Sequence, residues 1–314
     1  MSPRPIIQVA AGCLINAAGE VLIAQRPAGK IAAGQWEFPG GKIEAGESAH
    51  DALVRELHEE LGVEVRQARP LIRITHTYSD RTVVLDTWCI NAFDGEPHGR
   101  ENQAFAWVRP ERLHDYPLLA ADGPIVTALR LPADYCFTPE RFSAQQVLDQ
   151  LGGVPRDALL RLRLPSLSDA DYVALARLCV QRGCRVMLDR DPAMLDGKIA
   201  GWHASGAQLH RLNQRPVPGT QWFAASVHNA SELQLALKLG VDFVVIGAVQ
   251  ATASHPGEAA MGWDSFDGLV RQANVPAYAI GGVGPAQHRQ LFAHYAQGSA
   301  GISAYWSVES VGGS

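Results

Sequence analysis

The chain has 314 residues, of which 47% are hydrophobic and 19% are charged, and its formal net charge is −5. Such a composition packs a core and excludes wholesale disorder, and the length suits one large domain or two smaller ones. The negative charge argues against direct nucleic-acid binding, which needs a basic face, and the apolar runs are too short to span a membrane. Five scattered cysteines form no C-x-x-C pair and no signal-peptide pattern opens the chain, so we expect a cytoplasmic protein with free thiols.

The first 130 residues predict strands around one amphipathic helix. This helix is predicted over residues 48–61, where apolar residues recur at helical spacing, Ser48 is a suitable N-cap and Gly62 a suitable stop. A Gly-rich loop that contains Trp36–Gly41 precedes it. The other predicted elements are strands at 6–15, 20–25, 71–76, 82–92 and 104–108 and a helix at 118–130.

A domain boundary is predicted near residues 131–134, because the rhythm of the sequence changes there. Short apolar runs then alternate with helical stretches from residue 159 to residue 304. Strands that alternate with helices form βα units, which build a parallel sheet or a barrel. We therefore expect an α/β protein with domains at 1–131 and 132–309.

Three glutamates of the predicted helix, Glu56, Glu59 and Glu60, are spaced i, i+3 and i+4 and share one face. An isolated pattern of this kind is usually a solvated acidic face, but crowded carboxylates also attract a cation. Oxygen ligands suit Mg²⁺, with Mn²⁺ as the other candidate. Such ions bridge phosphate oxygens and stabilise the charge that develops during substitution at phosphorus. Arg55 can pair with Glu47 and hold the loop against the helix.

The segment Gly41–Val63 resembles a complete Nudix box, and the chain up to about residue 130 resembles a MutT-type Nudix hydrolase. The resemblance implies an α/β/α sandwich and metal-dependent hydrolysis of a nucleoside diphosphate linked to a further group. In the MutT branch, water attacks the β-phosphorus of a nucleoside triphosphate, and the products are the monophosphate and pyrophosphate. The favoured substrate of that branch is oxidised dGTP. The resemblance therefore implies an 8-oxo-dGTP diphosphatase that sanitises the nucleotide pool and so serves DNA repair and replication fidelity.

The resemblance also assigns roles to residues of this chain. The implied metal ligands are Glu56, Glu59, Glu60, Glu101 and the carbonyl of Gly40. The implied structural residues of the box are Gly41, Glu47, Arg55 and Gly62. Either Glu56 or Glu101 takes the proton from the attacking water, and the sequence leaves this choice open.

Four residues are candidates for substrate contacts: Arg26, Phe38, Arg81 and Asp122. Arg26 is either a clamp for the phosphates or the base or a surface arginine, and Phe38 belongs either to the base pocket or to the core. Asp122 stands where the MutT branch places an Asn on the guanine edge. An Asp only accepts hydrogen bonds unless it is protonated, so it can accept from guanine N1–H and N2–H₂ but cannot donate to O6. This departure leaves the preferred nucleobase open.

The second half of the chain resembles thiamine-phosphate synthase and its TenI-like relatives, which are compact TIM barrels. The resemblance is carried by the strings Tyr135–Pro139, Ser226–Asn229, Gly240–Gly247 and Ala279–Val283. It implies a phosphate pocket at the Gly-rich ends of the late strands. The candidate residues for this pocket are Arg163, His228, Gly281, Gly282 and Ser303.

The catalytic pattern of that family is incomplete in this chain. The segment Arg161–Pro165 lacks the Gln and the Lys of the family's Gln-x-Arg-x-Lys pattern, and a metal-binding acid is missing near Gln208. We therefore expect a barrel that binds a phosphorylated small ligand or regulates, without synthase chemistry. The alternative is a bifunctional Nudix hydrolase and thiamine-phosphate synthase that acts in thiamine metabolism.

Overall fold

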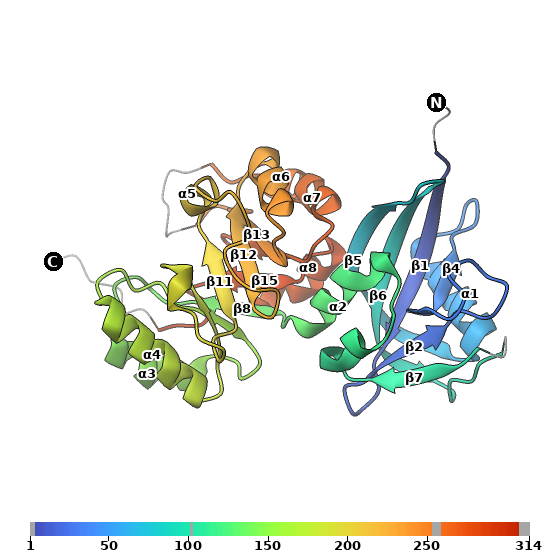
Figure 1. Cartoon of the computed structure of the whole chain (residues 1–314), viewed down its shortest axis with the longest axis horizontal. Helices are drawn as coiled ribbons and strands as arrows, with labels where there is room; N and C mark the ends of the chain where they lie inside the picture. The colour runs from blue at the N-terminus through green and yellow to red at the C-terminus, as the bar shows by residue number, and fades with distance from the viewer. Residues whose placement is uncertain (1–3, 101–102, 253–258, 308–314) are drawn as a thin grey trace. The chain divides into compact units, whose positions relative to one another are not determined.

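The computed structural model describes residues 4–100, 103–252 and 259–307 (Figure 1). The chain divides into two compact units, which are described separately here. The first unit comprises Met1–Arg130 with Phe292–Tyr295, and the second comprises Leu131–Leu291 with Ala296–Ser314. Within the described ranges, no helix combines the length and the hydropathy that crossing a membrane requires.

Two sheets build the first unit. Their strands are β1 (Ile6–Leu14), β2 (Val21–Gln25), β3 (Trp36–Glu37), β4 (Gly40–Lys42), β5 (Glu64–Thr77), β6 (Thr82–Asp94) and β7 (Phe105–Val108). One sheet has the order β4-β1-β6-β5, in which β1 runs parallel to β6 and antiparallel to β4. The other sheet has the order β3-β2-β7. Strand β5 is longer than the predicted strand at 71–76 because its polar first half, up to Pro70, pairs with β6 through several register shifts. Pro and polar residues weaken the sequence signal of a strand.

Two helices cover opposite faces of these sheets. Helix α1 (Ala49–Leu61) packs its apolar side against Ala10 and Leu14, whereas α2 (Gly123–Arg130) packs with Ala11 and Cys13. Adjacent residues of a strand point to opposite faces of the sheet. The helices therefore enclose the sheets from two sides, which confirms the α/β/α sandwich.

The ends of the two helices follow from their sequence. Ser48 Oγ accepts the N–H of Asp51, and Gly62 ends α1 in the left-handed conformation with φ 70°. Helix α2 begins at Gly123, later than the predicted start at residue 118, after two 3₁₀ turns, η1 (Pro110–Asp115) and η2 (Ala120–Asp122). Pro124 lies in the first turn of α2, where a missing N–H costs no hydrogen bond.

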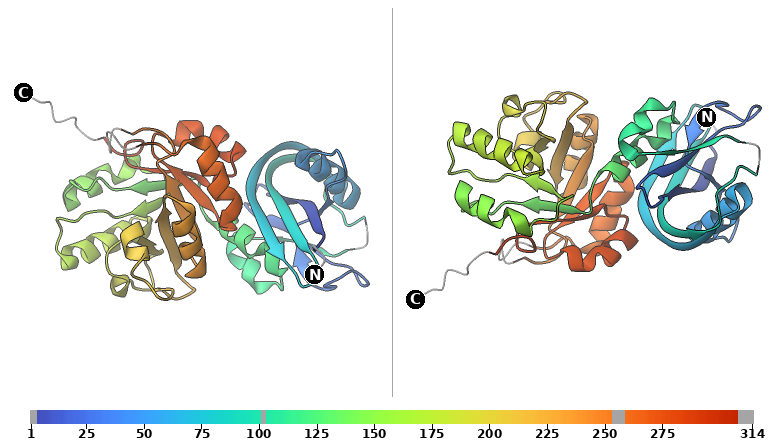
Figure 2. Two further views of the ribbon diagram at one scale, coloured as in Figure 1. Left: turned by 90° about the horizontal axis from the view of Figure 1, so that it is seen from above. Right: turned by 90° about the horizontal axis from the view of Figure 1, so that it is seen from below.

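The second unit is a closed barrel of parallel strands in the order β10-β11-β12-β13-β14-β15-β8-β9. The strands are β8 (Asp134–Phe137), β9 (Leu159–Arg161), β10 (Arg185–Leu188), β11 (Gly201–Ala204), β12 (Trp222–Val227), β13 (Phe243–Gly247), β14 (Ala277–Ile280) and β15 (Gly298–Gly301). The helices are α3 (Ala144–Gln150), α4 (Asp169–Gln181), α5 (Gly206–Leu209), α6 (Ala230–Lys238), α7 (Gly262–Ala273) and α8 (His288–Ala293), with 3₁₀ turns η3 (Leu151–Gly153), η4 (Pro192–Met194) and η5 (Pro285–Gln287). Figure 2 shows the helices outside the strands. The predicted TIM-type barrel is confirmed.

Aromatic side chains fill the interior of this barrel. The Tyr135 ring contacts Phe137, Phe243 and Tyr278, with ring centroids 4.8, 5.8 and 5.4 Å apart. The barrel is therefore a packed core and not a pore. Because all its strands are parallel, their carboxyl ends meet at one mouth, where the following loops can form a site.

Candidate functional site

In the first unit, helix α1 brings a carboxylate against the backbone of β4. A Cβ placed on Gly41 would overlap the carboxyl group of Glu56. A Cβ on Gly40, which has φ +145°, would overlap the carbonyl oxygen of Ala10 and lie 2.9 Å from the Cα of Ala11. Gly40 leaves no room for a side chain beside the backbone, and at Gly41 a side chain would displace the Glu56 carboxyl group, so the two glycines let the acidic face of α1 approach the strand closely.

The three glutamates of this face differ in their surroundings. The Glu56 side chain is 17% exposed and packs on Gly41, whereas Glu59 is 59% exposed. Glu60 Oε2 accepts the backbone N–H of Gly40 at 3.1 Å. Glu56 and Glu60 therefore face the two glycines of β4, and Glu59 lies on the outer part of the same helix face.

Arg55 supplies the positive charge among these acids. Its Nε and Nη2 donate to the two oxygens of Glu47 at 2.9 and 3.0 Å, and Nη2 also donates to the Lys42 carbonyl at 3.1 Å. Its Nη1 lies between Glu56, at 2.8 Å, and Glu59, at 3.4 Å. The hydrogen bonds to Glu47 and Glu56 raise the pKa of the guanidinium, and the Arg55 bond in turn lowers the pKa of Glu47. The structure thus contains the Arg55–Glu47 pair that ties the loop to the helix.

The chemistry of this set fits a hard divalent cation, since its donors are carboxylate and carbonyl oxygens. In the described part of the chain, no three acidic, histidine or cysteine side chains converge on one metal position. Arg55 Nη1 holds Glu56 and Glu59 instead. Glu101, the fourth acid implied by the sequence, lies outside the described residues.

A second polar group of the first unit gathers the substrate-side candidates. Arg26 Nη1 forms an ion pair with Glu37, and its Nε donates to the Ile31 carbonyl at 2.7 Å. Burial raises the pKa of Glu37, and Arg26 opposes this shift. Asp122 is 3% exposed; burial, followed by the charge of Glu37, raises its pKa well above the usual range. Glu37 had no sequence signal of its own beyond its place beside the glycine loop.

The remaining candidates of this group have simpler surroundings. The Phe38 side chain is buried in the core cluster that packs under α2, and its backbone N–H donates to Asp122. Arg81 pairs with Asp80 at 2.7 Å, and its guanidinium lies 5.2 Å from the centre of the Tyr78 ring. The pKa of Tyr78 is raised by burial and then by the charge of Asp122. The structure thus connects Asp122 to both Phe38 and Tyr78.

The candidate phosphate residues of the second unit all follow carboxyl ends of barrel strands. Arg163 follows β9, His228 follows β12, Gly281 and Gly282 follow β14, and Ser303 follows β15. Arg163 forms an ion pair with Glu140, and His228 Nδ1 lies 3.0 Å from Glu232. Gly281 and Gly282 have φ +92° and +67°, which are backbone conformations that favour glycine. The structure places these residues at one mouth of the barrel.

Sequence reasoning missed a buried polar cluster behind this mouth. Arg161 is 6% exposed, and its Nη2 atom lies 3.4 Å from Asp189 Oδ2. His203 is fully buried between Tyr135 Oη and Ser226 Oγ, each at 2.9 Å. Burial, followed by the charge of Arg161, lowers the pKa of His203 well below its usual value, so its imidazole is neutral. The sequence singled out Arg161 only because its segment departs from the catalytic pattern of the synthase family, and nothing in the sequence pointed to His203.

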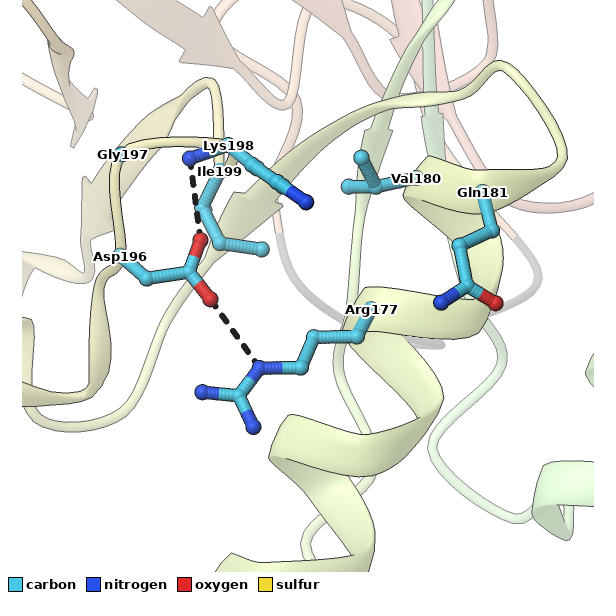
Figure 3. A pocket seen from close by; sticks show the side chains of 7 residues that line it. All are labelled: Arg177, Val180, Gln181, Asp196, Gly197, Lys198 and Ile199. Atoms are coloured by element: carbon cyan, nitrogen blue, oxygen red, sulfur yellow. Dashed lines mark hydrogen bonds and ion pairs between the residues drawn. The ribbon is translucent and has the colours of Figure 1, made fainter.

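A surface hollow of about 390 Å³ lies elsewhere on the second unit (Figure 3). It is formed by the end of α4 and by the loop before β11, where Asp196 accepts from Arg177 Nε and from the Lys198 N–H, both at 3.0 Å. Both segments lead into the amino ends of strands. The hollow therefore lies opposite the mouth, away from the candidate phosphate residues.

Comparisons with known proteins match both units. A family model described as the NUDIX domain matches residues 10–128, and one described as thiamine monophosphate synthase matches residues 145–305. The CTP pyrophosphohydrolase of Escherichia coli K12 is 42% identical over 123 residues, which are 39% of this chain and 90% of that protein. The 8-oxo-dGTP diphosphatase of the same organism is 34% identical over 124 residues, which are 40% of this chain and 96% of that protein.

The second unit has its own relative. The thiamine-phosphate synthase of Thermosynechococcus vestitus is 30% identical over 138 residues, which are 42% of this chain and 38% of that protein. The chain belongs to the Nudix hydrolases through its first unit and to the thiamine monophosphate synthase family through its second.

Proposed function

We propose that the first unit is a metal-dependent nucleoside-triphosphate pyrophosphohydrolase that acts on oxidised dGTP and yields the monophosphate and pyrophosphate. The observation that carries the proposal is the placement of Glu56 and Glu60 against Gly40 and Gly41. Among the relatives, the 8-oxo-dGTP diphosphatase and the CTP pyrophosphohydrolase are both named for hydrolysis of a nucleoside triphosphate or its analogue.

In this proposal Glu56, Glu59 and Glu60 hold Mg²⁺ or Mn²⁺ with the Gly40 carbonyl, and Glu101 completes the set. A divalent ion held by these residues would supply Lewis-acid stabilisation of the charge that develops during substitution at phosphorus. Glu56 is the base that we favour, because its half-buried carboxylate is held by Gly41 and Arg55 in one position. A general base must first be positioned within reach of the water it deprotonates.

The box residues that do not touch substrate keep this geometry. Arg55 is fixed by two parallel bonds to Glu47, and this fork resists rotation more than a single bond would. Gly62 ends α1 so that the chain turns back into β5. Arg26 and Arg81 are the cations that we assign to the triphosphate, since both act on Tyr78 and Arg26 also acts on Asp122.

The proposal is tested by pyrophosphate release from oxidised dGTP, dGTP and dCTP with Mg²⁺ and with Mn²⁺. Glu56→Gln should lower kcat by about 10²–10⁴, the usual contribution of a general base. Glu44→Gln is the matched control, because Glu44 is an exposed acid in the loop between β4 and α1. Release of pyrophosphate from no triphosphate, or equal rates for both variants, would refute the proposal.

We further propose that the barrel binds a phosphorylated small ligand and does not catalyse thiamine-phosphate synthesis. Arg163 is already engaged by Glu140, and Asp189 by Arg161. Neither side chain is then free to hold a pyrophosphate or a metal in the way such a synthase requires. Formation of thiamine phosphate from hydroxymethylpyrimidine pyrophosphate and thiazole phosphate would establish the bifunctional alternative instead.

A further inference from the structure

The hollow between the end of α4 and the loop before β11 is bordered by a turn that its own hydrogen bonds hold in place. Asp196 begins this turn, and its Oδ1 atom accepts the backbone N–H of Lys198 at 3.0 Å, while its carbonyl accepts that of Ile199 at 3.1 Å. From β12's side, Gln221 Nε2 donates to the carbonyls of Asp196 and Ile199 at 2.8 and 3.0 Å. A site that is formed before its ligand arrives binds without the cost of ordering a loop.

Asp196 also orients a cation of α4. Its Oδ2 atom accepts Arg177 Nε at 3.0 Å, and the bonds from the Lys198 N–H and from Arg177 lower the pKa of Asp196, so this acid stays ionised near neutral pH. Arg177 Nη1 and Nη2 have no hydrogen-bond partner among the described residues, and the same holds there for the Lys198 ammonium. Figure 3 shows the Lys198 side chain extended from the turn in the direction of α4. Both cations therefore keep donors available for a ligand.

Apolar side chains form the remaining wall of the hollow. Ile199 is 4% exposed, Val180 is half-buried, and both line the hollow. Its volume of about 390 Å³ lies within the range of roughly 300–1,000 Å³ that is usual for sites of small organic molecules. The charged lining residues are Arg177, Lys198 and Asp196, so two cations face one anion. The hollow thus carries a single positive charge beside an apolar surface.

We propose that this hollow binds a small organic acid, whose carboxylate is held by Arg177 and Lys198 and whose carbon chain packs on the apolar wall. The planar pair of Arg177 Nη atoms matches the two oxygens of a carboxylate. A phosphate monoester carries close to two negative charges at neutral pH, which is more than the hollow compensates. The site lies opposite the barrel mouth and does not depend on the function proposed for either unit.

A titration of the full chain, observed through ¹³C-labelled Ile and Val methyl groups by NMR, tests this inference with hexanoate as the probe. The methyl signals of Ile199 and Val180 should shift and saturate as hexanoate is added. Butyrate, which has the same charge on a shorter chain, should bind about two- to fourfold more weakly for each methylene lost. Hexanamide, which has the same size without the charge, should bind at least about tenfold more weakly.

Three variants separate the site from general surface charge. Lys198→Gln removes an ammonium that makes no bond within the described part of the chain, so the fold should persist while the Kd of hexanoate rises about fivefold or more. Arg177→Lys keeps the charge but loses the paired nitrogens, and it should also weaken binding. Lys238→Gln, at an exposed lysine of α6, is the matched control and should leave the Kd unchanged.

The inference fails on any of four results. An Ile199 methyl signal that does not move with hexanoate means that the hollow takes no organic acid. Equal Kd values for hexanoate and hexanamide mean that the negative charge is not recognised. A Kd of Lys198→Gln that equals that of Lys238→Gln places the carboxylate elsewhere. Tighter binding of hexyl phosphate than of hexanoate assigns the hollow to phosphate esters instead.

Discussion

Replacement of Gly41 by Ala separates the fold of the proposed active site from its chemistry. The added Cβ overlaps the carboxyl group of Glu56 and meets no backbone atom among its three nearest neighbours. This carboxyl group is the free end of a side chain, and it must retreat by roughly 1 Å to reach ordinary van der Waals contact. Overpacking of this kind costs about 1–3 kcal/mol of stability. Misplacement of a catalytic group by about 1 Å costs about 10²-fold in rate.

Two neighbouring glycines serve as matched controls. An Ala at Gly40 would meet the backbone of Ala10 and Ala11 at φ +145°, so Gly40→Ala should destabilise the first unit more than Gly41→Ala does. Gly46 has φ +84° and nothing within 4 Å of an added Cβ. Gly46→Ala should therefore cost about 1–2 kcal/mol of backbone strain and leave the rate of hydrolysis close to that of the wild type.

The assay combines urea unfolding with kcat/KM for pyrophosphate release. We expect Gly41→Ala to lose about 1–3 kcal/mol of stability and to be at least about 10²-fold slower. Gly46→Ala should lose a similar amount of stability and keep its activity. A Gly41→Ala variant with wild-type kcat/KM would refute the reasoning, since the position of Glu56 would then have no bearing on the reaction.

Three further predictions concern charged and titrating groups. Arg55→Lys keeps the charge but loses the fork on Glu47, so kcat/KM should fall by about tenfold or more; an unchanged value would show that the fork is dispensable. Arg161→Met leaves the largely buried Asp189 without its cation, which should lower stability by at most about 3 kcal/mol in urea unfolding, and an unshifted unfolding midpoint would contradict this. His203 stays neutral in the fold but takes a proton below about pH 6.5 when unfolded, so stability should be lost as pH falls below that value. His203→Gln should narrow the difference in Tm between pH 7 and pH 5, and an unchanged difference would contradict a neutral, buried His203.

The sequence predicted most of the first unit because its signals are local. Apolar spacing, the Ser48 cap and the Gly62 stop lie within a few residues of each other, and α1 forms where they place it. Helix α2 was predicted too long, because an apolar pattern does not show that the helix begins only at Gly123 and that 3₁₀ turns precede it.

The site was predictable only in part, because its chemistry depends on contacts between distant segments. The spacing of Glu56, Glu59 and Glu60 indicates a shared helix face, but not that Arg55 Nη1 lies between Glu56 and Glu59. The raised pKa of Asp122 follows from burial and from the charge of Glu37, neither of which is visible in the local sequence. The roles assigned to individual residues therefore stay predictions.

The barrel shows the same limit. The alternation of apolar runs and helical stretches predicts the closed barrel, since each βα unit repeats the same local pattern. The cluster of Arg161, Asp189 and His203 joins three different strands or their ends and has no counterpart in local spacing. Such a cluster appears only once the strands are placed side by side.

The reaction class is tested most directly by hydrolysis of oxidised dGTP in ¹⁸O-labelled water, with mass analysis of both products. Attack on the β-phosphorus predicts that the label enters pyrophosphate and that the nucleoside monophosphate stays unlabelled. Label in the monophosphate, or release of orthophosphate in place of pyrophosphate, would contradict the account.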